Sequence, residues 1–181
     1  MAETFGKPLI TQEAMRARIR ELGKQISRDY QGKDLVVVGA LKGAYVFFAD
    51  LVRVIQLPIE IDFIIATGTK KTGRPAKAVK IWTELNENIS KRHVLLVEDI
   101  VDSGLTAQYL VSQLQKYKPA SVAVCTLLSK SANRQIEIEV KYIGFEVPSA
   151  YIVGYGLDFE QKYRNLPYLA KMAPERVQKK S

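Results

Sequence analysis

Short apolar, β-branched segments alternate along the chain with segments whose apolar residues recur at helical spacing, and this alternation constrains the fold most. Alternating strands and helices are typical of α/β domains, in which helices flank a largely parallel central sheet. Ligands of such sheets bind beyond the carboxyl ends of the strands. The expected strands are 35–39, 59–66, 79–85, 94–97, 121–128, 140–147 and 151–155, and the expected helices are 12–26, 43–55 and 105–117.

The first expected helix follows Thr11, whose hydroxyl can cap its amino terminus. Apolar residues recur along it at spacings of three or four positions, which is typical of an amphipathic helix with one face on the core. These residues are Met15, Ile19, Leu22 and Ile26.

Length and composition favour a single domain spanning 1–181. A chain of 181 residues falls in the usual range of ~100–200 residues per domain, and 47% hydrophobic with 25% charged residues is ordinary for a globular protein. Its apolar stretches are far shorter than the ~18 residues that span a bilayer, and the start MAETFGKPLI lacks the apolar core of a secretory signal. We therefore expect a cytoplasmic protein without a membrane span. With one cysteine, Cys125, and one histidine, His93, an internal disulfide is excluded and a zinc site is unfavourable.

Basic residues outnumber acidic ones by 27 to 19, and the net charge of +8 predicts an anionic partner. Nucleic acid, anionic lipid and a polyphosphate metabolite all agree with this charge, as does a basic surface without a special role. Part of the excess lies in segment 67–80, which contains no acid and is expected to be a mobile lid or a solvated hairpin tip. The tail, 174–181, is expected to fray.

The segment 94–106, VLLVEDIVDSGLT, carries the chemistry. We expect the strand to end at Val97, so that Glu98 and Asp99 follow it and the run DSGLT leads into a helix. Backbone N–H groups in such a turn, together with the helix amino terminus, bind a phosphate without a lysine. The two carboxylates can accept hydrogen bonds from vicinal ribose hydroxyls, so the segment favours a ribose 5-phosphate. A simple helix cap would leave Glu98 and Asp99 unexplained.

The run EDIVDSG resembles the PRPP-binding motif of type I phosphoribosyltransferases, and its form is similar to that of the hypoxanthine-guanine branch. The segments LKGAYVFFADL, LLSK, GFEVP, YIVGYGLDF and YRNLP occur in the order that this family shows, and the resemblance covers roughly residues 8–172. It implies a mostly parallel sheet with a small hood and a mobile lid, Mg²⁺ as cofactor, and a homodimer or homotetramer. It also implies transfer of phosphoribose from PRPP to N9 of a 6-oxopurine, giving IMP or GMP and diphosphate in purine salvage.

The resemblance assigns the phosphoribose half of the site. Glu98 and Asp99 would bind the ribose, and Asp102 would also be the catalytic base at purine N7. The diphosphate would contact the loop Leu41, Lys42 and Gly43 together with Arg134 and Arg164, and a non-proline cis peptide often precedes this lysine in the family. The 5-phosphate loop would be Asp102, Ser103, Gly104, Leu105 and Thr106.

The purine half is implied in the same way. Lys130 would donate to the 6-oxo group, Tyr151 would stack on the base, and Ile152 would offer main-chain contacts. Asp158 would lie beside the purine and the metal, which Glu98 and Asp99 would also contact. Without the resemblance, Lys130 would be taken as a solvated lysine, Tyr151 as a core residue, and Asp158, Arg134 and Arg164 as members of surface ion pairs.

The lid departs from the family pattern. The family usually has a Ser-Tyr pair there, but the stretch from Ala66 is ATGTKKTG, in which Thr67 or Thr69 could supply a hydroxyl. An alternative function is a PRPP-responsive regulator that binds nucleic acid. The positive net charge would suit such a regulator, but the sequence has no recognisable helix-turn-helix or RNA-binding motif.

Overall fold

The computed structural model describes residues 7–68, 79–81, 83 and 85–172. A six-stranded sheet of order β3-β2-β1-β4-β5-β6 forms its centre. Its strands are β1 (Leu35–Leu41), β2 (Glu60–Gly68), β3 (Val79–Ile81), β4 (His93–Val101), β5 (Ser121–Ser129) and β6 (Tyr142–Glu146). β3 pairs antiparallel with β2, and the other pairings are parallel. The expected α/β architecture is confirmed.

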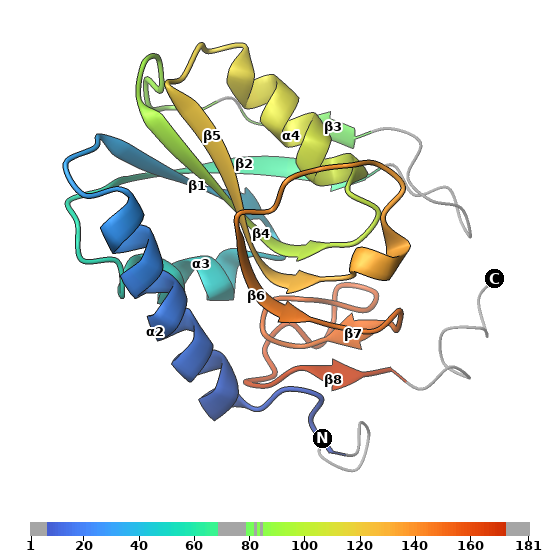
Figure 1. Ribbon diagram of the computed structural model, residues 1–181. Coiled ribbons are helices and arrows are strands. Elements are labelled where there is room, and N and C mark those ends of the chain that lie inside the picture. The colour runs from blue at the N-terminus through green and yellow to red at the C-terminus, as the bar shows by residue number, and fades with distance from the viewer. Residues whose placement is uncertain (1–6, 69–78, 82, 84, 173–181) are drawn as a thin grey trace.

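Helices cover both faces of the sheet (Figure 1). α2 (Gln12–Asp29) and α3 (Tyr45–Val52) lie on one face, over a core that includes Val37 and Leu95. α4 (Leu105–Gln115) lies on the other face, over a core that includes Val36 and Leu96. Because successive residues of a strand point to opposite faces, one apolar strand contributes side chains to both cores. None of these helices has the length and apolar content needed to cross a bilayer.

The amino-terminal helix forms as its sequence predicts. The Thr11 hydroxyl accepts a hydrogen bond from the Ala14 N–H at 3.2 Å. The four apolar stripe residues are buried, together with Gly23. Arg18 reaches from this helix to the carbonyls of Ile143 and Gly144 on β6 at 2.8 and 3.0 Å, so the helix is fixed to the edge of the sheet.

β4 is longer than its sequence predicts. The expectation that it ends at Val97 is wrong, because β5 continues beside it and pairs Glu98 with Thr126 and Val101 with Ser129. Pairing with β5 thus extends β4, so that Glu98 and Asp99 lie inside this strand rather than after it.

The expected third strand, 79–85, is also shorter in the structure, and it is antiparallel to its neighbour β2. β3 ends at Ile81 and pairs with the end of β2 in the register Ala66–Ile81, Thr67–Lys80 and Gly68–Val79. Both ends of the expected lid therefore belong to a strand pair, while residues 69–78 and the tail 174–181 lie outside the described residues.

A small second sheet forms the hood. It consists of β7 (Ile152–Val153) and β8 (Ala170–Lys171), which pair antiparallel below β6 in Figure 1. The sequence indicates the first of these strands but not the second. The Leu9 N–H donates to the Leu169 carbonyl at 2.7 Å, so the segment before α2 holds the hood.

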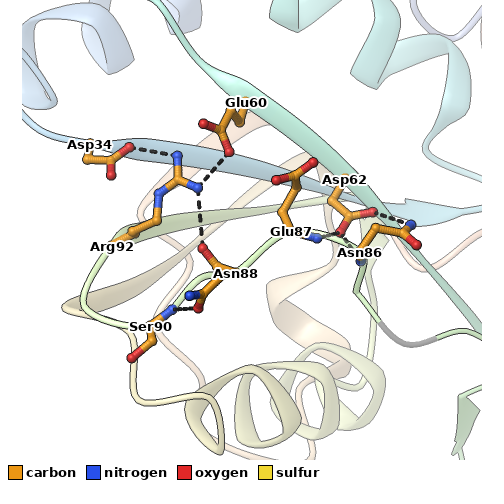
Figure 2. A network of polar contacts seen from close by, with 8 residues as sticks. All are labelled: Asp34, Glu60, Asp62, Asn86, Glu87, Asn88, Ser90 and Arg92. Atoms are coloured by element: carbon orange, nitrogen blue, oxygen red, sulfur yellow. Dashed lines mark hydrogen bonds and ion pairs between the residues drawn. The ribbon is translucent and has the colours of Figure 1, made fainter.

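A polar network closes the amino-terminal edge of the sheet (Figure 2). Arg92 pairs with Asp34 at 2.7 Å and with Glu60 at 2.6 Å. The buried Asp62 carboxylate on β2 accepts hydrogen bonds from the N–H groups of Asn86 and Glu87 at 2.6 and 2.9 Å. The loop before β4 is thereby tied to β2, on the side of the sheet away from the segment that carries the chemistry.

Candidate active site

Two adjacent cavities lie at the carboxyl edge of the sheet. The larger has a volume of about 390 Å³ and the smaller about 230 Å³. Four residues line both cavities: Asp99, Ile100, Asp102 and Asp158. A ligand with two chemically different halves can therefore occupy both cavities and meet the same acidic side chains at their boundary.

The turn between β4 and α4 forms one wall of the larger cavity, which Asp102, Ser103, Gly104 and Thr106 line. Gly104 precedes α4 with a φ of 88°, a left-handed conformation that glycine adopts without steric cost. The amino terminus of α4 begins at the next residue, and a helix amino terminus attracts an anion. The exposed Leu105 side chain is not among the residues that line either cavity.

Glu98 and Asp99 lie side by side in β4 and line the larger cavity. Burial raises the pKa of the Glu98 carboxyl well above its usual range, and the charge of Asp99 adds to this effect. Burial raises the pKa of Asp99 to about 6, while backbone N–H groups and Arg164 act in the opposite direction. The Glu98 Oε1 atom is buried and has no hydrogen-bond partner among the described residues, so a donor or a cation from a ligand would supply one.

The loop after β1 packs closely against these acids. A Cβ atom on Gly43 would lie 1.7 Å from Asp99 Oδ2, so only glycine allows this approach. A Cβ on Gly156 would in turn lie 2.1 Å from the Gly43 carbonyl oxygen. The Leu41–Lys42 peptide is cis, and Leu41, Lys42 and Gly43 all line the larger cavity.

Asp158 and Arg164, which follow β7 in the chain, form an ion pair that lines the larger cavity. Arg164 Nη2 lies 2.8 Å from Asp158 Oδ1, and Arg164 Nη1 donates to the Gly156 carbonyl at 2.8 Å. Gln161, which sequence reasoning missed, also lines this cavity and accepts a hydrogen bond from Arg164. One guanidinium in the larger cavity is therefore held in place by three oxygen atoms.

The smaller cavity carries the residues expected to bind a base. Lys130, Tyr151 and Ile152 line it, and the Tyr151 hydroxyl donates to the Asp158 carbonyl at 3.1 Å. The Lys130 side chain is 10% exposed, and its ammonium lies 3.2 Å from Asp102 Oδ2. A buried cation with three donors and an aromatic ring suit a flat ligand that presents a carbonyl oxygen.

Arg134 is not brought into either cavity. Its guanidinium lies behind the turn, where it donates to the Asp102 carbonyl at 3.2 Å and to the Ser129 hydroxyl at 3.1 Å. Asn133, which the sequence analysis did not single out, donates to Asp102 Oδ1 at 2.8 Å. Nothing local in the sequence marks this asparagine, because its partner lies 31 residues away.

Within the described part of the chain, no three or more His, Cys, Asp and Glu side chains are grouped so as to hold a metal ion. The three acids expected as ligands, Glu98, Asp99 and Asp158, are therefore not assembled into one such cluster. Asp99 and Asp158 nevertheless face both cavities and provide the oxygen donors that a hard cation prefers.

Comparison with known proteins agrees with this geometry. Residues 9–160 match the family model described as a phosphoribosyl transferase domain. The hypoxanthine phosphoribosyltransferase of Haemophilus influenzae is 44% identical over 171 residues, which cover 92% of this chain and 95% of that protein. The bifunctional protein TilS/HprT of Listeria monocytogenes is 43% identical over 97% of this chain, which spans only 27% of the length of that relative.

A solved structure is also similar to this chain. The crystal structure of a hypoxanthine phosphoribosyltransferase from Staphylococcus aureus superposes with a TM-score of 0.92 at 38% identity. The match covers 97% of this chain and 96% of that chain. The similarity therefore extends over the sheet, the hood and both cavities.

Proposed function

The chain belongs to the phosphoribosyl transferase family, among the hypoxanthine phosphoribosyltransferases, and from this premise we propose that it transfers phosphoribose from PRPP to a 6-oxopurine. The reaction joins the anomeric carbon of the ribose to N9 of hypoxanthine or guanine and releases diphosphate. The observation that carries this proposal is the position of Asp99, Asp102 and Asp158 at the boundary of two cavities. One of these cavities suits an anionic sugar and the other suits a flat base.

PRPP would occupy the larger cavity. The turn 102–106 and the amino terminus of α4 would hold the 5-phosphate through N–H groups and hydroxyls. Glu98 and Asp99 would accept hydrogen bonds from the ribose hydroxyls, which would give the unpartnered Glu98 oxygen a donor. Lys42 and Arg164 would face the diphosphate.

The purine would occupy the smaller cavity. Lys130 would donate to the 6-oxo oxygen, Tyr151 would stack on the ring, and the main chain at Ile152 would contact its edge. Asp102 lines both cavities and lies 3.2 Å from Lys130, so its carboxylate would lie between the base and the anomeric carbon.

Breaking the anomeric C–O bond develops positive charge on the ribose and negative charge on the diphosphate, as in glycoside cleavage. Lys42 and Arg164 would stabilise the leaving diphosphate electrostatically. The base would attack through N9 while Asp102 accepts the proton from N7. The proton thus moves from purine N7 to a carboxylate oxygen, and the electron pair of the broken bond leaves with the diphosphate.

Magnesium suits this site as the cofactor. Mg²⁺ commonly binds through one or two carboxylates and keeps water or substrate oxygens as its other ligands. Asp99 and Asp158, which face both cavities, would hold the ion. When bound, it would neutralise part of the charge of the diphosphate.

The test is an assay of the purified protein with PRPP, Mg²⁺ and one base at a time: hypoxanthine, guanine, xanthine, adenine and uracil. We expect nucleotide and diphosphate from hypoxanthine or guanine and no turnover of adenine or uracil. Use of uracil with refusal of every purine would contradict the proposal. The solution molar mass of the same preparation tests the expected homodimer or homotetramer.

A nucleic-acid-binding regulator would behave differently from a transferase in the same preparation. It requires retention on nucleic acid at moderate salt without turnover of any base. The relatives described above are named as enzymes, so the transferase remains the single function that we propose.

A further inference from the structure

The segment after β5 holds the turn that precedes α4. Lys130 N–H donates to the Val101 carbonyl and Gln135 N–H to the Ser103 carbonyl, each at 3.0 Å. Arg134 donates to the Asp102 carbonyl between them at 3.2 Å. The main chain of 101–103 is thus fixed by three hydrogen bonds that do not involve the side chain of Asn133.

The side chain of Asp102 is held separately, with one partner for each oxygen. Asn133 Nδ2 donates to Oδ1 at 2.8 Å, and Lys130 Nζ lies 3.2 Å from Oδ2. The Asp102 side chain is 47% exposed, so packing alone does not fix the plane of its carboxylate. The orientation of a carboxylate about its last torsion is only weakly restricted by the chain itself, so these two donors set it.

The inference rests on the proposed function, in which the two donors, Lys130 and Asn133, have different roles. Lys130 has to serve the 6-oxo oxygen of the incoming base, so its hold on Asp102 weakens when the substrate binds. Asn133 lies in the short 3₁₀ helix Ser131–Asn133, and its own N–H donates to the Lys130 carbonyl at 3.0 Å. This bond fixes the main chain at Asn133, and the proposed function gives its carboxamide no other partner when a base binds.

We infer that Asn133 is a positioning residue, which fixes Oδ1 of Asp102 and so presents Oδ2 to the N7 proton of the purine. The amide of Asn133 donates to the carboxylate and takes no part in proton transfer. Small errors in the position of a reacting group can cost up to about 10²-fold in rate. The expected effect of Asn133 is therefore on the chemical step rather than on PRPP binding.

The experiment is a double-mutant cycle with Asn133→Leu and Asp102→Ala, measured in single turnovers with enzyme in excess so that slow variants remain measurable. Leucine keeps the approximate size of asparagine and removes the donor. We expect Asn133→Leu alone to lower the rate of the chemical step about tenfold and to change the KM for PRPP less than about twofold. In the Asp102→Ala background it should change the rate less than about twofold, because a residue that acts only through Asp102 has nothing left to position.

Two further variants separate positioning from structural damage. Ser131→Ala removes an exposed side chain from the same 3₁₀ helix and should leave rate and KM unchanged. Asn133→Gln keeps the carboxamide donor on a longer side chain and should recover part of the rate that Asn133→Leu loses. The thermal midpoint of each variant is recorded to verify that it is folded.

The inference is overturned if Asn133→Leu lowers the rate equally in both backgrounds, because this is the result of a structural role. An unchanged rate in the Asn133→Leu variant overturns it as well. Failure of the proposed function gives a different result, namely a wild-type protein that forms no nucleotide from PRPP and hypoxanthine. Activity of the wild type therefore separates the two failures.

Discussion

At the scale of single residues, the pair formed by Lys130 and Asp102 connects the two halves of the site. The buried ammonium lies 3.2 Å from the carboxylate, which provides the partner that a buried charge requires. A purine with a 6-oxo group offers Lys130 a second acceptor. Adenine offers an amino group instead, whose hydrogens would face the ammonium, so the donors that point toward the base would have no acceptor.

We therefore expect Lys130→Gln to lower kcat/KM for hypoxanthine and to reduce the hypoxanthine/adenine ratio of kcat/KM by at least about tenfold. A site whose buried polar groups are left unpaired by the wrong substrate discriminates by up to roughly 10⁴–10⁵, and glutamine offers both a donor and an acceptor. Lys116→Gln, an exposed lysine at the end of α4, is the matched control. A ratio unchanged by Lys130→Gln would mean that another group, such as the main chain near Ile152, recognises the 6-position.

At the scale of elements, the far edge of the sheet depends on a buried carboxylate. Asp62 on β2 is 5% exposed and binds the backbone of the loop that leads into β4 (Figure 2). β4 in turn carries Glu98 and Asp99 to the opposite edge. The position of the loop before β4 is thus connected, through the strand, to the site.

We expect Asp62→Asn to lower the free energy of unfolding by about 1–3 kcal/mol, because an amide nitrogen cannot accept the hydrogen bond that one carboxylate oxygen accepts. Urea denaturation at neutral pH measures this change. The matched control is Asp34→Asn in the same network, where the side chain is 65% exposed and the expected loss is below about 1 kcal/mol. Equal losses in the two variants would contradict the role assigned to Asp62.

At the scale of the whole molecule, a hydrogen bond joins α2 to the last strand of the main sheet. The hydroxyl of the buried Tyr142 donates to Asp29 Oδ2 at 2.7 Å, across 113 positions of sequence. This bond, together with the contact to Lys141, lowers the pKa of Asp29 below its ordinary value of 3.8. A carboxyl group whose pKa is lower in the folded state stabilises that state above its unfolded pKa.

The stabilisation by Asp29 is therefore complete above pH 3.8 and is lost as the pH falls through the lower folded pKa. We expect Tyr142→Phe to cost about 1 kcal/mol at pH 7 and less at the acid end of the measurable range. Urea unfolding of wild type and variant across this range measures the difference. Tyr117→Phe, an exposed ring just after α4, should show no such dependence. A cost for Tyr142→Phe that does not change with pH would refute the link to Asp29.

Features that depend on neighbours along the chain can be predicted from the amino-acid sequence. Thr11 and the stripe beginning at Met15 specify α2, because capping and periodicity are local properties. The alternation of elements predicts the α/β sheet, and the run 98–106 places acids, hydroxyls and a glycine at the end of one strand. These features also carry the resemblance to the phosphoribosyltransferases.

Features that depend on contacts between distant segments become visible only in the folded chain. β4 continues beyond Val97 because it pairs with β5, and the residues of β4 by themselves do not predict this pairing. Asn133 meets Asp102, and Gly43 meets Asp99, only after parallel strands bring their carboxyl ends to one edge of the sheet. Arg134 turns behind the loop because its guanidinium finds carbonyl and hydroxyl acceptors there. The cause is the same in each case. Residues that come into contact only when distant segments pack together share no periodic or local pattern in the sequence.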